Sequence, residues 1–278
     1  MYMKLTRGIE LPGMRKSTHA MKLLRNLYSG KAASRIWIQH LCKGLQNMGF
    51  GPLIVDECVW YRGDIIFTFY VNNGIIWCPQ AEAIAEFMRD IRKSDLKKQN
   101  FDIEDRGDVS DYLGITFERQ DNGLIKLSQP QPINQIIRDV GIEKHRSIPT
   151  PSPSTNILHQ DLEGKPFKGD FNFHSVVGNI KFIENVSIPD IAYSVHQCAR
   201  FSIDPRDSHG EAIRHIAKYL KGTRDKGITV NPRMENSFEV YVDASFSGEW
   251  IKESEARDPG KAKIRSGYIV IIHGFPLI

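Results

Sequence analysis

The chain has 278 residues, of which 41% are hydrophobic and 25% are charged, and its formal net charge is +4. This composition is typical of a folded globular protein and argues against extensive disorder, and the length suits roughly two domains. The longest apolar runs, such as residues 65–71, are far shorter than a bilayer span, and the opening segment lacks the apolar stretch of a secretory signal. We therefore expect an intracellular protein, cytoplasmic or nuclear, that makes no membrane contact.

Basic residues gather at the start of the chain. The first fifty residues hold nine Lys and Arg residues against one acid, Glu10, and so carry +8 where the remainder carries −4. Such a segment suits a polyanion such as nucleic acid, and an ordinary solvated face explains it equally well. The four cysteines include no C-x-x-C pair, and His209 and His215 are six positions apart. We expect no disulfide framework and no metal site from these residues, with surface or capping roles for the histidines.

Two amphipathic helices are predicted in the first half of the chain. Apolar residues recur every three or four positions over residues 31–48, and Gly49 follows them as a stop signal. Pro79 suits the first turn of a second helix, whose residues 84–91 carry apolar side chains on one face.

Three strand-like runs lie between these helices, at residues 58–61, 65–71 and 74–77. The Asn72-Asn73 step separates the second run from the third and is typical of a tight turn, which predicts a hairpin. A second hairpin is predicted further on, where an alternating strand over residues 113–117 turns back at Asn122-Gly123. Helices and hairpins in this alternation indicate an α+β fold.

Three prolines within residues 148–154 exclude regular structure there and predict the first domain boundary. Beyond them, apolar periodicity predicts helices over residues 173–184, 189–201 and 209–221. Ser208 and Glu211 have the spacing of a capping box at the start of the last helix, and Gly222 follows its end.

Strands are predicted over residues 238–242, ending on Asp243, and over residues 267–272.

Three stretches in fixed order carry a family resemblance. They read LYSGKAASRIW at residues 27–37, FYVNNGIIW at residues 69–77 and VYVDASFSGEW at residues 240–250. Together they resemble the reverse transcriptase and ribonuclease H portion of Ty1/copia-type retrotransposon polyproteins, and weaker matches between them extend the resemblance over nearly the whole chain.

The resemblance implies a division of the chain into four parts. Residues 1–147 would form partial fingers and the palm of a reverse transcriptase, and residues 148–154 a Pro-rich linker. Residues 155–235 would form a helical thumb or connection, and residues 236–278 the truncated N-terminal part of a ribonuclease H-like sheet.

The resemblance also implies a polymerase site at the first hairpin. In the family this turn reads Tyr-Val-Asp-Asp, and the two aspartates, with a third from an upstream strand, hold two Mg²⁺ ions. Here the turn is Tyr70-Val71-Asn72-Asn73, and the strand carrying the third aspartate precedes the matching segment. Because Mg²⁺ prefers anionic oxygen, neutral amides are expected to leave the metal pair unassembled and the enzyme inactive.

Other site residues follow from the same matches. Lys31 and Arg35 match a segment that borders the incoming nucleotide in the family, and their charges could bind its phosphates. An exposed basic face of the helix is the better explanation for them. Tyr70 and Trp77 suit base stacking, although residues at strand spacing are more often core. Asp243 matches the first ribonuclease H carboxylate, and the next acidic ligand of the family falls beyond the last match.

Two main functional hypotheses result. The first is a degenerate fragment of a retrotransposon reverse transcriptase with no competent polymerase or nuclease site, weak or absent binding of RNA or DNA template-primer, and no productively bound Mg²⁺. The second is a non-catalytic nucleic-acid-binding or interaction module on the same scaffold. An enzyme completed by another chain is a third, which the Asn pair disfavours. Unpaired strand edges at the truncated sheet are expected to favour self-association.

Overall fold

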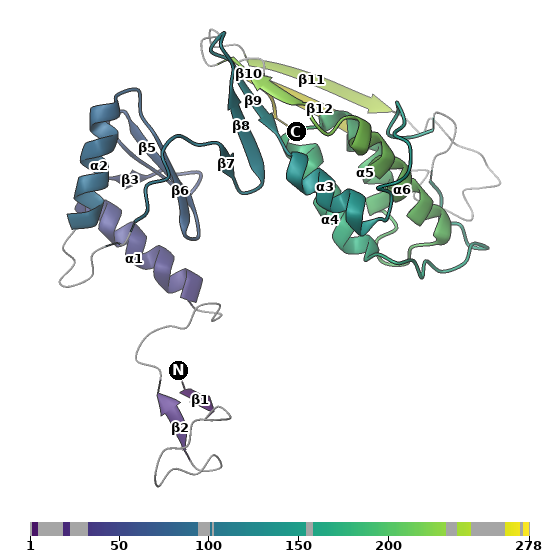
Figure 1. Cartoon of the computed structure of the whole chain (residues 1–278), viewed down its shortest axis with the longest axis horizontal. Helices are drawn as coiled ribbons and strands as arrows, with labels where there is room; N and C mark the ends of the chain where they lie inside the picture. The colour runs from purple at the N-terminus through teal and green to yellow at the C-terminus, as the bar shows by residue number, and fades with distance from the viewer. Residues whose placement is uncertain are drawn as a thin grey trace. The chain divides into compact units, whose positions relative to one another are not determined.

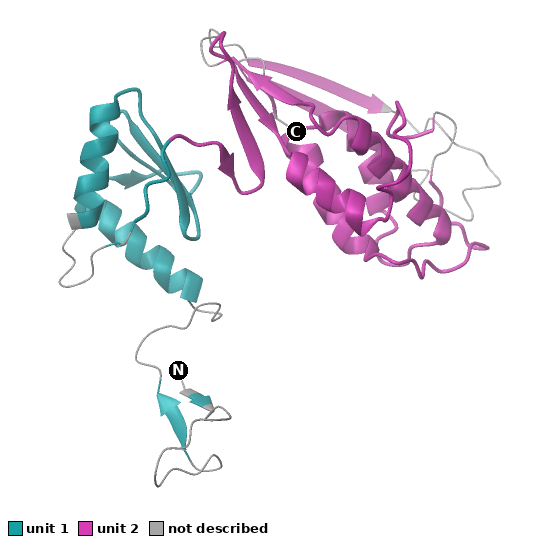
Figure 2. Cartoon of the chain, viewed as in Figure 1, with its two compact units in different colours: residues 1–107 teal, residues 108–278 magenta. Residues whose placement is uncertain are grey.

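The computed structural model describes residues 2–4, 19–22, 33–93, 101, 103–153, 158–231, 238–245, 265–272 and 275–277. The chain forms two compact units, residues 1–107 and residues 108–278 (Figure 2). Each unit contains both helices and antiparallel strands, as predicted for an α+β fold (Figure 1). Among the helices that are described, none is long and apolar enough to cross a membrane.

Unit 1 contains a short antiparallel pair and a four-stranded antiparallel sheet of order β3-β4-β5-β6, accompanied by two helices. Its elements are β1 (Tyr2–Lys4), β2 (Ala20–Lys22), α1 (Ala33–Asn47), β3 (Gly51–Pro52), β4 (Val59–Arg62), β5 (Ile65–Tyr70), β6 (Asn73–Trp77) and α2 (Ala81–Lys93).

Helix α1 agrees with the predicted amphipathic segment, although residues 31 and 32 lie outside the described residues. Gly49 ends it as predicted, because it adopts φ of +82° and the Phe50 backbone N–H then donates to the Leu45 carbonyl at 3.0 Å. Helix α2 begins at Ala81, so Pro79 lies just ahead of the first turn and not within it.

The sheet of unit 1 has one buried and one open face. Along β5 the side chains of Ile65, Phe67 and Phe69 are buried, and the alternate residues Ile66 and Tyr70 are exposed. The buried residues share one apolar core with α1 and α2, so both helices cover the same face. This core comprises Leu41, Leu45, Phe50, Trp60, Ile65, Phe67, Phe69, Phe87, Met88, Ile91 and Phe101.

Unit 2 contains two antiparallel sheets, of order β10-β9-β8-β7 and β11-β12-β13, and a group of helices. Its elements are β7 (Asp111–Tyr112), β8 (Ile115–Arg119), β9 (Ile125–Ser128), α3 (Pro130–Asp139), α4 (Phe173–Val186), the 3₁₀ turn η1 (Pro189–Ile191), α5 (Ala192–Ala199), α6 (Asp207–Gly222), β10 (Gly227–Val230), β11 (Phe238–Ser245), β12 (Arg265–Ile272) and β13 (Phe275–Leu277).

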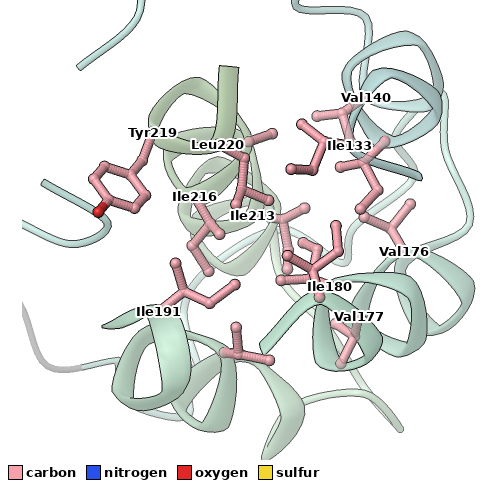
Figure 3. Packing of buried hydrophobic residues seen from close by; sticks show 14 of the residues in the cluster. Ile133, Val140, Val176, Val177, Ile180, Ile191, Ile213, Ile216, Tyr219 and Leu220 are labelled. Atoms are coloured by element: carbon pink, nitrogen blue, oxygen red, sulfur yellow. The ribbon is translucent and has the colours of Figure 1, made fainter. Parts of the chain in front are cut away.

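The helices of unit 2 surround a second apolar core that includes fully buried Ile133, Ile180, Ile213 and Leu220 (Figure 3). Strand β9 comes directly before α3, and β10 follows α6. These two strands pair antiparallel, so the two ends of the helical segment lie side by side. Helix α3 was not predicted. Pro130 lies in its first turn, where a backbone N–H would have no hydrogen-bond partner within the helix, so proline costs no hydrogen bond there.

The predicted first boundary at residues 148–154 differs from the observed division between residues 107 and 108. The reason is that α3 lies before the prolines yet packs in one core with α4, α5 and α6. The proline-rich segment instead lies within unit 2, where the Thr150 carbonyl is 3.1 Å from Nε2 of His215.

Two local predictions also need correction. Leu113 has φ of +52° and, with Gly114, forms the turn between β7 and β8 instead of belonging to a strand. Helix α6 is capped by Arg206 and His209, not by Ser208 and Glu211, because Nδ1 of His209 accepts from the Arg206 backbone N–H at 2.9 Å.

Candidate functional site

The turn between β5 and β6 is the candidate site. Tyr70 and Asn73 are cross-strand partners, so Val71 and Asn72 form the turn and Asn73 begins β6. The predicted Asn72-Asn73 turn is therefore displaced by one residue. Val71 adopts φ of +54°, which is unfavourable for a β-branched side chain and is the kind of local strain found at functional sites.

Helix α1 holds this turn through Trp37. The indole Nε1–H donates to the Val71 carbonyl at 2.7 Å, and the ring packs edge-on against Phe101 with centroids 5.8 Å apart. The apolar periodicity of residues 31–48 predicts only that Trp37 lies on the apolar face of the helix. The available signal was its indole N–H, because a partly buried indole usually requires an acceptor.

Asn72 and Asn73 both have exposed side chains, and each offers only a neutral carboxamide. Among the described residues, no group of three or more His, Cys, Asp or Glu side chains is placed to hold a metal ion. Mg²⁺ prefers anionic oxygen ligands and dehydrates reluctantly, so two neutral carboxamides do not fit the ion pair implied by the resemblance. We derive no metal-dependent step from this turn.

The open face of the sheet beside the turn is aromatic and apolar. Tyr61, Ile66 and Trp77 form one row across β4, β5 and β6, and Tyr70 lies on the same face next to the turn. Tyr70 is 60% exposed and Trp77 is 41% exposed, so the expectation that they are core residues is wrong. The Trp77 Nε1–H donates to Oγ1 of Thr68 at 3.3 Å.

The remaining predicted site residues are distributed over both units. Arg35 is exposed on α1, two positions before Trp37, while Lys31 lies outside the described residues. Asp243 is exposed on β11 opposite Gly267 of β12. It belongs to unit 2, whereas Asn72, Asn73 and Tyr70 belong to unit 1.

Comparison with known proteins identifies relatives among retrotransposon proteins. The chain is 27% identical over 236 residues to a transposon Ty5-1 protein of Saccharomyces cerevisiae, covering 83% of this chain and 74% of that protein. It is 26% identical over 259 residues to the retrovirus-related Pol polyprotein from transposon TNT 1-94 of Nicotiana tabacum, covering 89% of this chain and 19% of the polyprotein.

A third relative is the retrovirus-related Pol polyprotein from transposon RE1 of Arabidopsis thaliana, 24% identical over 269 residues, with 94% of this chain and 17% of the polyprotein covered. The chain thus spans less than a fifth of the length of either polyprotein. No solved structure matches the chain significantly.

The model of one protein family, described as reverse transcriptase (RNA-dependent DNA polymerase), matches residues 1–153, more than half of the 278 residues. The matched region includes α1, the β5–β6 turn and α2, the elements that carry the candidate site. The chain therefore belongs to the reverse transcriptase (RNA-dependent DNA polymerase) family, and the family predicted from its motifs is confirmed.

Proposed function

We propose that this chain is a member of the reverse transcriptase family that has kept the scaffold and lost polymerase activity. The observation that carries the proposal is the pair of neutral side chains, Asn72 and Asn73, at the β5–β6 turn. Metal stabilisation of developing charge contributes several kcal/mol, and each ~1.4 kcal/mol changes a rate tenfold. Losing that stabilisation lowers polymerisation by several orders of magnitude.

We extend the proposal to the two units. Unit 1 corresponds to part of the fingers and palm, and the helices of unit 2 to a thumb or connection. The antiparallel sheet β11-β12-β13, with Asp243 on its first strand, corresponds to the beginning of a ribonuclease H-like domain. One exposed carboxylate does not hold a pair of divalent ions, so we propose no nuclease activity for this sheet.

Primer extension tests the loss of polymerase activity. Purified chain, an RNA template with a DNA primer, and Mg²⁺ or Mn²⁺ are expected to give no extension above a protein-free control. An active reverse transcriptase on the same template serves as the positive control. Reproducible extension that co-purifies with the chain and disappears in an Asn72→Ala/Asn73→Ala variant would overturn the proposal.

A direct measurement of cation binding tests whether polymerase activity is absent because the turn does not bind divalent ions. Mn²⁺ titrated into the isotopically labelled chain is expected to leave the amide signals of residues 70–74 unbroadened, because the turn offers no anionic ligand. An Asn72→Asp/Asn73→Asp variant should broaden these signals selectively. Asn122→Asp adds a carboxylate at the β8–β9 turn and is the matched control, since it changes charge far along the sequence from this hairpin.

A second function, a non-catalytic nucleic-acid-binding module, is favoured by the exposed aromatic side chains beside the turn. Tyr70, Trp77 and Tyr61 present rings on the open face of the sheet, where stacking on a base contributes about 1–3 kcal/mol. Fluorescence anisotropy with single-stranded RNA and DNA at increasing salt distinguishes the two functions. Tight binding at physiological salt that weakens with Tyr70→Ala supports the module, whereas weak binding abolished by salt supports loss of function.

A further inference from the structure

The proline-rich segment of residues 148–153 is irregular and accessible. All six residues are described, each is at least partly exposed, and none belongs to a helix or a strand. A proline disfavours the helical conformation for the residue before it, which favours extended backbone at Thr150 and Ser152. The segment lies in unit 2, apart from the candidate site of unit 1.

Both hydroxyl residues of this segment directly precede a proline. The chain has 14 prolines, and Ser or Thr comes immediately before only two of them, in the steps Thr150-Pro151 and Ser152-Pro153. One class of Ser/Thr protein kinases selects an acceptor hydroxyl that is followed by proline. Proline fixes φ and has no backbone N–H, so this step differs physically from every other peptide step in the chain.

The two hydroxyl residues differ in accessibility. Thr150 is exposed, whereas Ser152 is half-buried and its hydroxyl donates to the Pro153 carbonyl at 3.3 Å. A kinase has to reach the acceptor oxygen and remove its proton. Thr150 therefore meets the requirements of an acceptor better than Ser152 does.

One side of α6 places basic side chains along this segment. The Lys221 ammonium donates to the His145 carbonyl at 2.8 Å. Six positions earlier on the helix, Nε2 of His215 donates to the Thr150 carbonyl at 3.1 Å. Lys218 lies between them, three positions from each, and residues at this spacing are neighbours on a helix surface.

We propose that Thr150 is the acceptor for a proline-directed Ser/Thr protein kinase. In this reaction the hydroxyl oxygen attacks the γ-phosphorus of a nucleoside triphosphate. The bond between oxygen and phosphorus forms, the bond from the γ-phosphorus to its bridging oxygen breaks, and the nucleoside diphosphate leaves with the electron pair. The hydroxyl proton passes to the catalytic aspartate of the kinase. The proposal concerns a modification of unit 2 and is independent of polymerase activity.

Phosphorylation is expected to strengthen the contact between the segment and α6. Phosphothreonine carries about −1.5 to −2 charge at neutral pH. Its phosphate is attached to the residue whose carbonyl contacts His215, well within the Debye length of about 8 Å at physiological salt. Burial lowers the pKa of His215, the bond to the Thr150 carbonyl opposes this effect, and Lys218 adds to it. An adjacent dianion favours the imidazolium and attracts Lys218, so it holds the segment to the helix.

Phosphorylation of the purified full chain tests the site. A proline-directed kinase with Mg²⁺ and ATP is expected to modify Thr150, which mass spectrometry of proteolytic fragments identifies. Pro151→Ala keeps the hydroxyl and should slow this modification at least about tenfold, because the fixed φ of proline is lost. Pro153→Ala is the matched control, since it removes the proline after Ser152 and should leave the rate at Thr150 unchanged. Circular dichroism confirms that both variants fold.

Phosphorus NMR of the phosphorylated chain tests the contact with α6. The second pKa of phosphothreonine is about 6, and the cations of α6 should lower it by about 0.5 relative to a phosphorylated peptide of residues 145–153. Lys218→Gln should remove much of this difference. Lys126→Gln is the matched control, because it removes the same charge from β9, where Lys126 lies 3.7 Å from Glu118. It should leave the phosphate pKa unchanged.

Three results would overturn the proposal. The first is an unmodified Thr150 in the full chain under conditions that phosphorylate the unmodified peptide of residues 145–153. The second is modification of Ser152 in preference to Thr150. The third is a phosphate pKa that is the same in the full chain and in the peptide, because the cations of α6 would then make no contact with the phosphate.

Discussion

The conformation of Val71 depends on a side chain distant in sequence. A valine at φ of +54° is strained, and such strain persists only where the surroundings hold the backbone in place. The hydrogen bond from the Trp37 indole to the Val71 carbonyl supplies that restraint from α1. The position of Asn72 at the β5–β6 turn thus depends on helix packing as well as on turn propensity.

We predict that Trp37→Phe loosens this turn. The ring would keep its contact with Phe101, but the hydrogen bond would be lost, at a cost of about 0.5–1.5 kcal/mol. Amide hydrogen exchange over residues 70–74 should accelerate. Trp60→Phe is the matched control, because its indole donates to the Glu57 carbonyl at 2.9 Å and not to the turn. Equal acceleration in both variants would show that Trp37 acts only through general stability.

His209 is a buried group whose protonation state follows from its partners. Nδ1 accepts from the Arg206 backbone N–H at 2.9 Å, and Nε2 lies 2.8 Å from the His159 carbonyl, so the ring is neutral with its proton on Nε2. It stacks on Phe201 with centroids 4.1 Å apart. Burial lowers the pKa of His209 below its usual value, and the nearby Arg206 adds to this effect.

The lowered pKa of His209 predicts that unit 2 loses stability in mild acid. Below the ordinary histidine pKa of about 6.5 the unfolded chain binds a proton that the folded chain does not, so stability falls as the pH drops towards the folded pKa. His209→Gln should reduce this pH dependence and cost about 1 kcal/mol at neutral pH through loss of the cap. Urea denaturation at several pH values measures both effects, and His174→Gln, at an exposed position on α4 away from this cap, is the control substitution.

Elements with strong local patterns were predicted and elements defined by distant contacts were not. Periodic apolar residues and stop signals identified α1, α2, α4 and α6, and the β5–β6 hairpin was found to within one residue. Strand β10 was missed because its four residues are defined by pairing with β9. The division between residues 107 and 108 has no local signal, because it depends on the packing of α3 against α4 and α6.

At the candidate site, the sequence predicts the position of the two asparagines but not the contacts that fix the conformation of their turn. The positive φ of Val71 and its bond to Trp37 arise only when α1 packs beside the hairpin. The exposure of Tyr70 and Trp77 was also missed, because strand periodicity does not reveal whether the second face of a sheet is covered.

The pairing of β9 with β10 predicts a strong effect of a small substitution at Gly227. A Cβ atom built there would clash with the Leu127 carbonyl oxygen, a backbone atom that cannot move aside cheaply. Gly227→Ala should therefore destabilise unit 2 by about 1–3 kcal/mol.

Gly178→Ala is the matched control for that substitution. Gly178 lies in α4, and a Cβ there meets nothing within 4 Å, so alanine should be neutral or stabilise the helix by up to about 1 kcal/mol. Thermal unfolding followed by circular dichroism compares the two. Equal effects of the two alanines would contradict the close approach at Gly227.

At the scale of the whole molecule, the two apolar cores formed by the described residues have no residue in common. One core includes residues from Leu41 to Phe101, and the other includes residues from Ile133 to Leu220, so each compact unit contains its own. Separate cores predict separate cooperative unfolding, because a defect in one core removes no contacts from the other.

We therefore predict that Ile213→Ala weakens unit 2 alone. Ile213 is fully buried in the helical core, and its truncation leaves a cavity that costs about 2–5 kcal/mol. Hydrogen exchange should show reduced protection in α4 and α6 and unchanged protection in α2 and β5. Phe87→Ala, at a fully buried position in the core of unit 1, should give the reverse pattern. Loss of protection in both units from either substitution would mean that the two units unfold as one cooperative structure. A cavity in one core lowers the stability of the other core only if the two unfold together.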